Sequence, residues 1–196
     1  MSEQTTSTTT CKTLVLGLTG SVGVLVMPTY VRMFREMLAE HVHVMMSRGA
    51  QRFITPYTFE LFTGNPVFSD TFDRIGDIKV PHLELSRRAD LFLIAPATAN
   101  VLAKCAHGLC DNLISTAVVA CRAPVVFAPS MNEDMWRSRV VRRNVELLRD
   151  LGHHILEPSM GIEIADLSPT YGAMPPVFEF IQSLRTILAE RRQPSE

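Results

Sequence analysis

The stretch LFLIA at residues 91–95 decides the fold class of this chain. All of its residues are apolar, which is typical of a strand that is buried on both faces in the centre of a parallel sheet. Short segments at residues 13–18 (TLVLGL), 41–46 (HVHVMM) and 125–128 (VVFA) have a similar character, and residues 153–156 indicate a last strand. The sequence therefore predicts a sheet built from these segments.

Segments with apolar residues at helical spacing separate the strands. Helices are expected over residues 24–39, 101–108, 111–120, 140–151 and about 177–191. Ser47 is a candidate cap for a further helix that holds Gln51 and Phe53. Residues 55–81 and 158–176 are expected to be irregular, because they contain Pro, Gly, Asp and Ser. Strands that alternate with helices predict one α/β domain with a single doubly wound, Rossmann or flavodoxin-like parallel sheet and helices on both faces.

Size and charge limit the classes of protein to which the chain can belong. Its 196 residues correspond to one domain, and its 46% apolar content is enough to bury a core. The 19 basic and 20 acidic residues give a net charge of -1, so neither nucleic acid nor an anionic membrane is expected as a partner. No apolar run reaches the roughly 18 residues that a membrane span requires.

The start of the chain and its cysteines indicate where the protein works. Residues 1–10 (MSEQTTSTTT) are expected to be a disordered tail before a domain of residues 11–196, and they lack the basic and apolar regions of a secretory signal. The four cysteines have no metal-ligand spacing, so we expect free thiols and no metal site. Reduced thiols predict a cytoplasmic protein.

Ligands of doubly wound sheets bind beyond the carboxyl ends of the strands. Four segments are predicted at that edge, at residues 19–21, 47–49, 96–100 and 129–136. Gly20, Ser21 and Val22 follow a buried strand and, with Ser47, suit a phosphate, because glycine permits close approach and the hydroxyls donate hydrogen bonds. An ordinary serine-capped turn fits this segment equally well. The dinucleotide pattern GxGxxG is absent, so a mononucleotide fits better than NAD.

The other two segments can also be interpreted in more than one way. Small residues at 95–100 leave room for a flat ring whose edge Thr98 and Asn100 would contact, or they simply begin a helix. In residues 129–136, Asn132 is suited to hold a carboxylate or an amide, although a tryptophan beside methionines is more often part of a core. The residue pattern alone does not favour His82 over the other histidines as a catalytic residue.

Three segments taken together are recognisable: HLELS at residues 82–86, PATAN at 96–100 and PSMNEDMW at 129–136. In this order they resemble the homo-oligomeric flavin-containing cysteine decarboxylases. That family includes phosphopantothenoylcysteine decarboxylase and the peptidyl-cysteine decarboxylases of lanthipeptide pathways, such as the epidermin and mersacidin enzymes. The similarity runs from about residue 12 to residue 184, and Lys104, Gly108 and residues 111–113 also fit the family pattern.

The resemblance implies a cofactor and a role for each site residue. The cofactor would be FMN, and the family assembles as homotrimers, often arranged into dodecamers, with the flavin at the trimer interface. His82 would be the catalytic base, and Asn132 would bind the substrate carboxylate. The cofactor contacts would be Gly20, Ser21, Val22 and Ser47 at the phosphate, Phe53 near the flavin, Ala97, Thr98 and Asn100 along the isoalloxazine, and Met131 from a neighbouring subunit.

The implied reaction is an oxidative decarboxylation of cysteine. A hydride leaves the cysteine β-carbon for oxidised flavin while a base removes the thiol proton. The resulting thioaldehyde accepts the electrons that remain when CO2 departs, and an enethiol forms. His82 suits the base because imidazole accepts protons near pH 7. Asn132 would hold the carboxylate without adding a charge.

Residues 158–176 distinguish two branches of the family. In the coenzyme A branch of the family that the sequence resembles, a flexible clamp over the substrate carries a cysteine that helps to return the enethiol to a thiol. Here that segment has no cysteine, and none follows Cys121. We therefore expect the peptidyl branch, with a C-terminal cysteine peptide as substrate and an aminoenethiol, the aminovinyl-cysteine precursor, as product. The residues expected to contact the substrate are Asn132, Met135, Met160, Tyr171 and Met174.

Other interpretations stay open. Residues 158–176 also fit a mobile surface loop with no role in binding. The chain would be a phosphopantothenoylcysteine decarboxylase if an unusual clamp served that substrate. It would be a regulatory subunit if it bound flavin and a partner without turnover, although the presence of both His82 and Asn132 argues against this.

Overall fold

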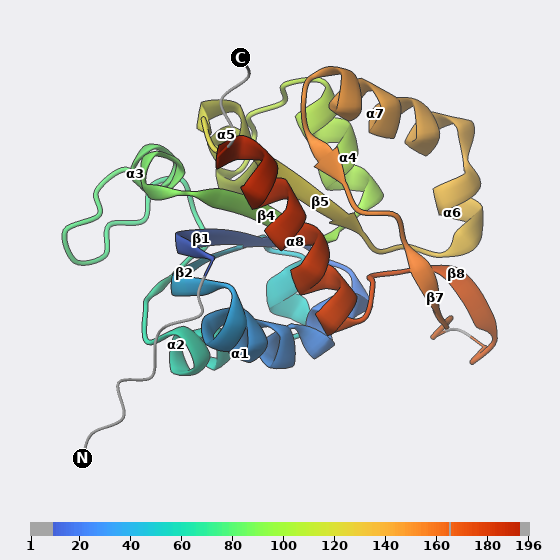
Figure 1. Cartoon of the computed structure of the whole chain (residues 1–196), viewed down its shortest axis with the longest axis horizontal. Helices are drawn as coiled ribbons and strands as arrows, with labels where there is room; N and C mark the ends of the chain where they lie inside the picture. Colours follow the sequence, from blue (N-terminus) through green and yellow to red (C-terminus); the bar gives the residue numbers. More distant parts are fainter. Residues whose placement is uncertain (1–9, 165, 193–196) are drawn as a thin grey trace.

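A computed structural model of the chain describes residues 10–164 and 166–192. Six strands form one sheet in the order β3-β2-β1-β4-β5-β6, and every neighbouring pair is parallel (Figure 1). The strands are β1 (Cys11–Leu18), β2 (Ala39–Met46), β3 (Val67–Phe68), β4 (Leu91–Ala97), β5 (Val125–Pro129) and β6 (His154–Ile155). This order is that of the doubly wound dinucleotide-binding folds, which confirms the predicted fold class.

Helices cover both faces of the sheet and enclose two apolar cores. One face carries α1 (Met27–Met37), α2 (Pro56–Thr63) and α8 (Val177–Arg192). The other carries α3 (Pro81–Arg88), α4 (Ala99–Ala106), α5 (Leu113–Ala120) and α7 (Arg139–Asp150). Figure 1 shows α1 and α2 on one side of the sheet and α4, α5 and α7 on the other. Every residue of β4 is buried, as a strand covered by helices on both faces requires.

The chain after β1 differs from the predicted helix over residues 24–39. A 3-10 helix, η1 (Val22–Val26), comes first, α1 then runs from Met27, and Ala39 already belongs to β2. Pro28 lies in the first turn of α1, where its missing N–H would have no helical partner in any case. The proline is thus compatible with a helix that starts at Met27.

The expectation that residues 55–81 are irregular was wrong for their first part. They contain α2, which starts at Pro56 and ends at Gly64 in the left-handed conformation, and β3, which pairs with β2. Residues 158–176 are also more ordered than expected, because β7 (Ser159–Ile162) and β8 (Pro169–Ala173) form an antiparallel hairpin. We call this the β7–β8 hairpin.

Two further observations concern the chain as a whole. The expected disordered tail lies outside the described residues, apart from residue 10. Among the helices in the described part of the chain, none is both long enough and apolar enough to cross a bilayer.

Candidate active site

The turns after β1 and β4 meet where the strand order reverses. Thr19, buried at the end of β1, joins them: its Oγ1 donates to the Pro96 carbonyl oxygen at 2.6 Å and accepts from the Thr98 N–H at 3.0 Å. Sequence reasoning did not single out Thr19. The only signal for it was a polar residue at the end of a buried strand. These bonds hold the two turns in fixed positions at the edge where ligands bind.

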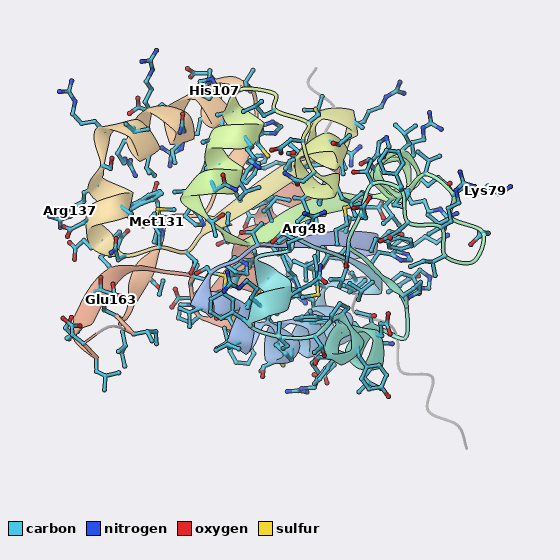
Figure 2. The ribbon with its side chains drawn as sticks, turned by 180° about the vertical axis from the view of Figure 1, so that it is seen from behind. Arg48, Lys79, His107, Met131, Arg137 and Glu163 are labelled. Atoms are coloured by element: carbon cyan, nitrogen blue, oxygen red, sulfur yellow. The ribbon has the colours of Figure 1, made fainter. Side chains whose placement is uncertain are left out.

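A first cavity of about 750 Å³ opens at this edge, between the ends of β1, β2, β3 and β4. Its walls include Gly20, Ser47, Arg48, Phe72, Thr98 and Asn100. Lys104 and Asp111 also line it and pair with each other at 2.7 Å. Hydrogen bonds from Lys104 and Asn112 hold the pKa of the Asp111 carboxyl below its usual value. Arg48 makes no ion pair with any described residue, so its guanidinium is available to an anion (Figure 2).

The turns after β1 and β2 come into backbone contact in this cavity. A Cβ on Gly20 would come within 2.9 Å of the Gly49 Cα, so a larger residue would push the turns apart. The Ser47 Oγ accepts the Ala50 N–H at 3.2 Å and keeps its own proton free to donate. This corner therefore offers a ligand the Ser47 hydroxyl, the backbone of Gly20 and the nearby Arg48 guanidinium.

A second cavity, of about 520 Å³, lies between η1, the segment after β5 and the β7–β8 hairpin. Its walls include Ser21, Val22, Met131, Asn132, Glu163 and Met174. The side chain of Met135 lines both cavities and so forms part of the wall between them. Ser21 and Ser130 hold two walls together through a hydrogen bond of 2.9 Å between their hydroxyls, and sequence reasoning had not assigned Ser130 a role.

Asn132 is the N-cap of α6 (Glu133–Arg137) and faces the second cavity. Its Oδ1 accepts the Met135 N–H at 2.9 Å, which fixes the orientation of the side-chain amide. No hydrogen bond among the described residues uses its Nδ2. The amide can therefore donate two hydrogen bonds to an acceptor in the cavity, such as a carboxylate.

The β7–β8 hairpin is attached to the Asn132 segment by its backbone. The Met131 N–H donates to the Gly172 carbonyl oxygen at 3.1 Å, and the Tyr171 N–H donates to Glu133 Oε2 at 3.4 Å. A Cβ on Gly172 would lie 2.0 Å from the Met131 carbonyl oxygen, so only glycine permits this contact. The hairpin is consequently a docked wall of the second cavity.

Comparison with known proteins identifies the family. A family model described as Flavoprotein matches residues 1–188. The chain belongs to the flavoprotein family.

Curated relatives of this flavoprotein include coenzyme A biosynthesis bifunctional proteins CoaBC. The Mycobacterium tuberculosis protein is 36% identical over 180 residues, which is 92% of this chain and 42% of that protein. The Escherichia coli protein is 36% identical over 159 residues, 81% of this chain and 39% of that protein. The flavoprotein thus spans about two fifths of the length of these relatives.

Solved structures of similar proteins cover the chain almost completely. The FMN-dependent cysteine decarboxylase SpaF has a TM-score of 0.78 and 31% identity, and the match covers 93% of this chain and 98% of SpaF. MrsD from a Bacillus species has a TM-score of 0.78 and 30% identity, with 93% and 99% covered. A PPC decarboxylase complexed with pantothenoylaminoethenethiol has a TM-score of 0.77 and 27% identity, with 91% and 98% covered. The predicted family and its cofactor, FMN, are confirmed by these similarities.

The first cavity of the flavoprotein fits FMN. Its volume is in the range of small-molecule sites, and the open corner at Gly20, Ser47 and Arg48 has the donors and the charge that a phosphate needs. Thr98 and Asn100 lie on the β4 side of the same cavity and would contact the ring edge. These residues would hold the cofactor.

The structure separates the other predicted cofactor residues from this cavity. Ser21, Val22 and Met131 line the second cavity. Ala97 is fully buried in the core beneath the site, and Phe53 is 46% exposed and lines none of the described cavities. Within one chain, therefore, these residues do not form the surface of the first cavity.

The structure does not bring all of the predicted substrate residues into one cavity. Asn132, Met135 and Met174 line the second cavity. Tyr171 lines a third cavity on the other side of the hairpin, with Trp136 and Arg142. Met160 is exposed and lines none of the three.

His82 lies apart from the other predicted catalytic residue. It belongs to the first turn of α3, and its Nδ1 is buried without a hydrogen-bond partner among the described residues. It lines none of the described cavities. Figure 2 shows Lys79, three residues earlier, at the opposite end of the molecule from Met131. One chain alone does not bring His82 and Asn132 together.

The cysteines do not supply a reactive group to either cavity. Burial raises the pKa of the Cys105 thiol to about 12, which keeps it protonated and unreactive at neutral pH. Burial also raises the pKa of the Cys121 thiol. Cys110 is exposed but lines none of the described cavities. None of these three thiols is therefore a candidate for a reactive group in the first or the second cavity.

Proposed function

We propose that this flavoprotein catalyses the FMN-dependent oxidative decarboxylation of the C-terminal cysteine of a peptide, with a C-terminal aminoenethiol as product. One observation carries the proposal: an apolar second cavity, containing the free amide of Asn132, shares the Met135 side chain with the cavity that fits FMN. A cysteine held by Asn132 would therefore lie beside the cavity that fits FMN.

Each residue of the second cavity has a distinct task in this scheme. The Asn132 Nδ2 donates to the substrate carboxylate, and its N-cap bond to Met135 keeps it oriented. A neutral amide orients the carboxylate without the strong ion pair that would resist its loss as CO2. Met131 and Met174 exclude water around the thiol-bearing carbon. Bound FMN supplies a two-electron acceptor, which the side chains of the chain lack.

His82 takes the thiol proton in this proposal, and it acts in the site of a neighbouring subunit. The support is that His82 lines none of the described cavities of its own chain, and that its Nδ1 has no hydrogen-bond partner among the described residues. The proposal requires a homo-oligomer, such as a trimer with the flavin between subunits, in which α3 of one copy would face the cavities of the next. A homo-oligomer is therefore part of the proposal.

The charge of the second cavity favours a peptide over phosphopantothenoylcysteine. Glu163 is the one charged residue among the described residues that line it. A phosphate group would meet a carboxylate there and find no cation, which is unfavourable. Val22, Leu25 and Ile162 give the same cavity apolar walls that suit uncharged side chains before the cysteine.

Of two alternatives, one has specific support. The CoaBC relatives and the PPC decarboxylase structure favour phosphopantothenoylcysteine as the substrate. Against this stands the β7–β8 hairpin, which has no cysteine that could help return the enethiol to a thiol. A flavin-binding subunit without turnover would need neither Asn132 nor His82.

Mass spectrometry of the products separates these functions. The purified flavoprotein is incubated in air with a peptide that ends in two apolar residues and cysteine, and separately with phosphopantothenoylcysteine. We expect the peptide to lose about 46 Da, corresponding to CO2 and two hydrogens, and the small substrate to remain unchanged. The same peptide with an amidated C-terminus is the control, and His82→Asn and Asn132→Asp should each abolish turnover.

Other outcomes would assign a different function. Loss of about 44 Da from phosphopantothenoylcysteine, with the peptide unchanged, would show the coenzyme A activity instead. Bound FMN with neither substrate altered would indicate the non-catalytic subunit.

A further inference from the structure

The side chain of Phe72 is 87% exposed, more than that of any other large apolar residue that the structure describes. It also lines the first cavity, together with residues 69–71. No other aromatic residue is found among the described residues that line this cavity. The ring is therefore the one aromatic group that the described lining of this cavity offers to a flat ligand.

Hydrogen bonds hold the turn that carries Phe72 in place. Asp73 Oδ2 accepts the N–H groups of Ser69 at 2.7 Å and Asp70 at 2.9 Å. Asp70 Oδ1 accepts the Phe72 N–H at 3.0 Å. The backbone at Phe72 is thus fixed, and the exposure of the ring is a property of the folded turn.

The sheet topology places Phe72 across the cavity from Thr98. Phe72 follows β3 and Thr98 follows β4, and β2 and β1 lie between these two strands. A flat ligand in the cavity would therefore have the start of α4 on one side and the Phe72 ring on the other. Phe53, which the resemblance assigned to the flavin, is not in this position.

We propose that Phe72 packs against FMN bound in the first cavity and shields its ring system from water. The inference rests on FMN occupying this cavity and is independent of which cysteine compound is the substrate. Aromatic contacts contribute beyond the area that they bury, so losing the ring weakens cofactor binding by roughly 2- to 10-fold. Phe72 is a positioning residue for the cofactor and takes no part in the proton transfers.

The test measures FMN binding and solvent access in Phe72→Ala, Phe72→Trp and the wild-type protein. The apoprotein is titrated with FMN, and the flavin fluorescence of the holoprotein is quenched with iodide. Phe72→Ala should bind FMN roughly 2- to 10-fold more weakly and show increased iodide quenching. Phe72→Trp should match the wild type, because it keeps an aromatic ring. Phe178→Ala is the control, since Phe178 is 63% exposed but lines none of the described cavities.

Three results would overturn the proposal in distinguishable ways. Unchanged FMN affinity and quenching in Phe72→Ala would show that the ring does not contact the flavin. Smaller oligomers on size-exclusion chromatography, with unchanged quenching, would show that Phe72 contacts a second copy instead. A wild-type protein that does not bind FMN would overturn the proposed function as well.

Discussion

At the scale of single residues, two side chains of opposite character would select the substrate in the proposed function. Asn132 presents neutral donors whose direction its helix cap fixes, and Glu163 presents a carboxylate from the β7–β8 hairpin. Asn132 would select for a free C-terminal carboxylate. Glu163 would select against a second negative charge nearby.

The charge preference can be reversed at Glu163. We expect Glu163→Lys to raise kcat/KM roughly two- to fivefold for a peptide with glutamate shortly before its terminal cysteine, and to lower it similarly for the lysine counterpart. The reason is that an exposed charge pair contributes only modestly in water. Steady-state kinetics on the two peptides at low salt measures the effect. Asp166→Lys is the control, because Asp166 lies on the same hairpin but does not line the cavity. Equal changes in both variants would rule out a specific role for Glu163.

The sequence predicted the positions of some site residues but not the contacts of others. Gly20, Ser47, Thr98 and Asn100 were placed correctly at one edge of the sheet, because each directly follows a strand with a clear apolar pattern. Thr19 and Ser130 lie in segments predicted at this edge but were given no role, since their roles come from partners far away in the chain: Thr19 bonds to Pro96, and Ser130 bonds to Ser21. No local pattern encodes a contact over that separation.

At the scale of elements, the β7–β8 hairpin is the part of the site whose position depends on one glycine. Gly172 has a φ of 153°, and its missing side chain lets the hairpin meet the Met131 carbonyl. The hairpin carries Glu163, Ile162 and Ile164 into the second cavity. Moving it would open the substrate side and leave the first cavity intact.

Gly172→Ala should therefore impair catalysis while FMN binding persists. We expect kcat/KM to fall roughly 10- to 100-fold, since a displacement of about 1 Å is costly at a reacting centre. Kinetics with the peptide and FMN titration measure the two effects. Gly152→Ala is a matched control, because Gly152 also has a positive φ, of 84°, but a Cβ there would meet nothing within 4 Å. Similar kinetic losses in both variants would mean that strain alone, and no hairpin displacement, explains the effect.

The elements that the sequence did not predict are the short ones. β3 has two residues, and its pairing with β2 defines it more than its own pattern does. The strands of the hairpin include Gly161, Pro169 and Gly172, which are typical of loops. The paired hairpin also bonds to the Asn132 segment through Gly172 and Tyr171, a tertiary contact that a local pattern does not encode. The long apolar runs of β1 and β4 needed no such information.

At the scale of the whole molecule, the doubly wound sheet places the first cavity and His82 in different parts of one chain. The strand order brings the ends of β1, β2 and β4 to one edge, where the first cavity forms. The same topology leaves α3, with His82, outside all of the described cavities. In the proposed mechanism, a second copy of the chain would therefore supply His82 to the site.

The most direct test of the central claim, that two electrons pass from the peptide cysteine to the bound cofactor, is anaerobic spectroscopy of the holoprotein. The peptide is added without oxygen, and the visible absorption band of oxidised flavin is recorded beside the peptide mass. We predict that the band bleaches and that one flavin is reduced for each peptide that becomes lighter by about 46 Da. A peptide that loses mass while the flavin stays oxidised would contradict the account.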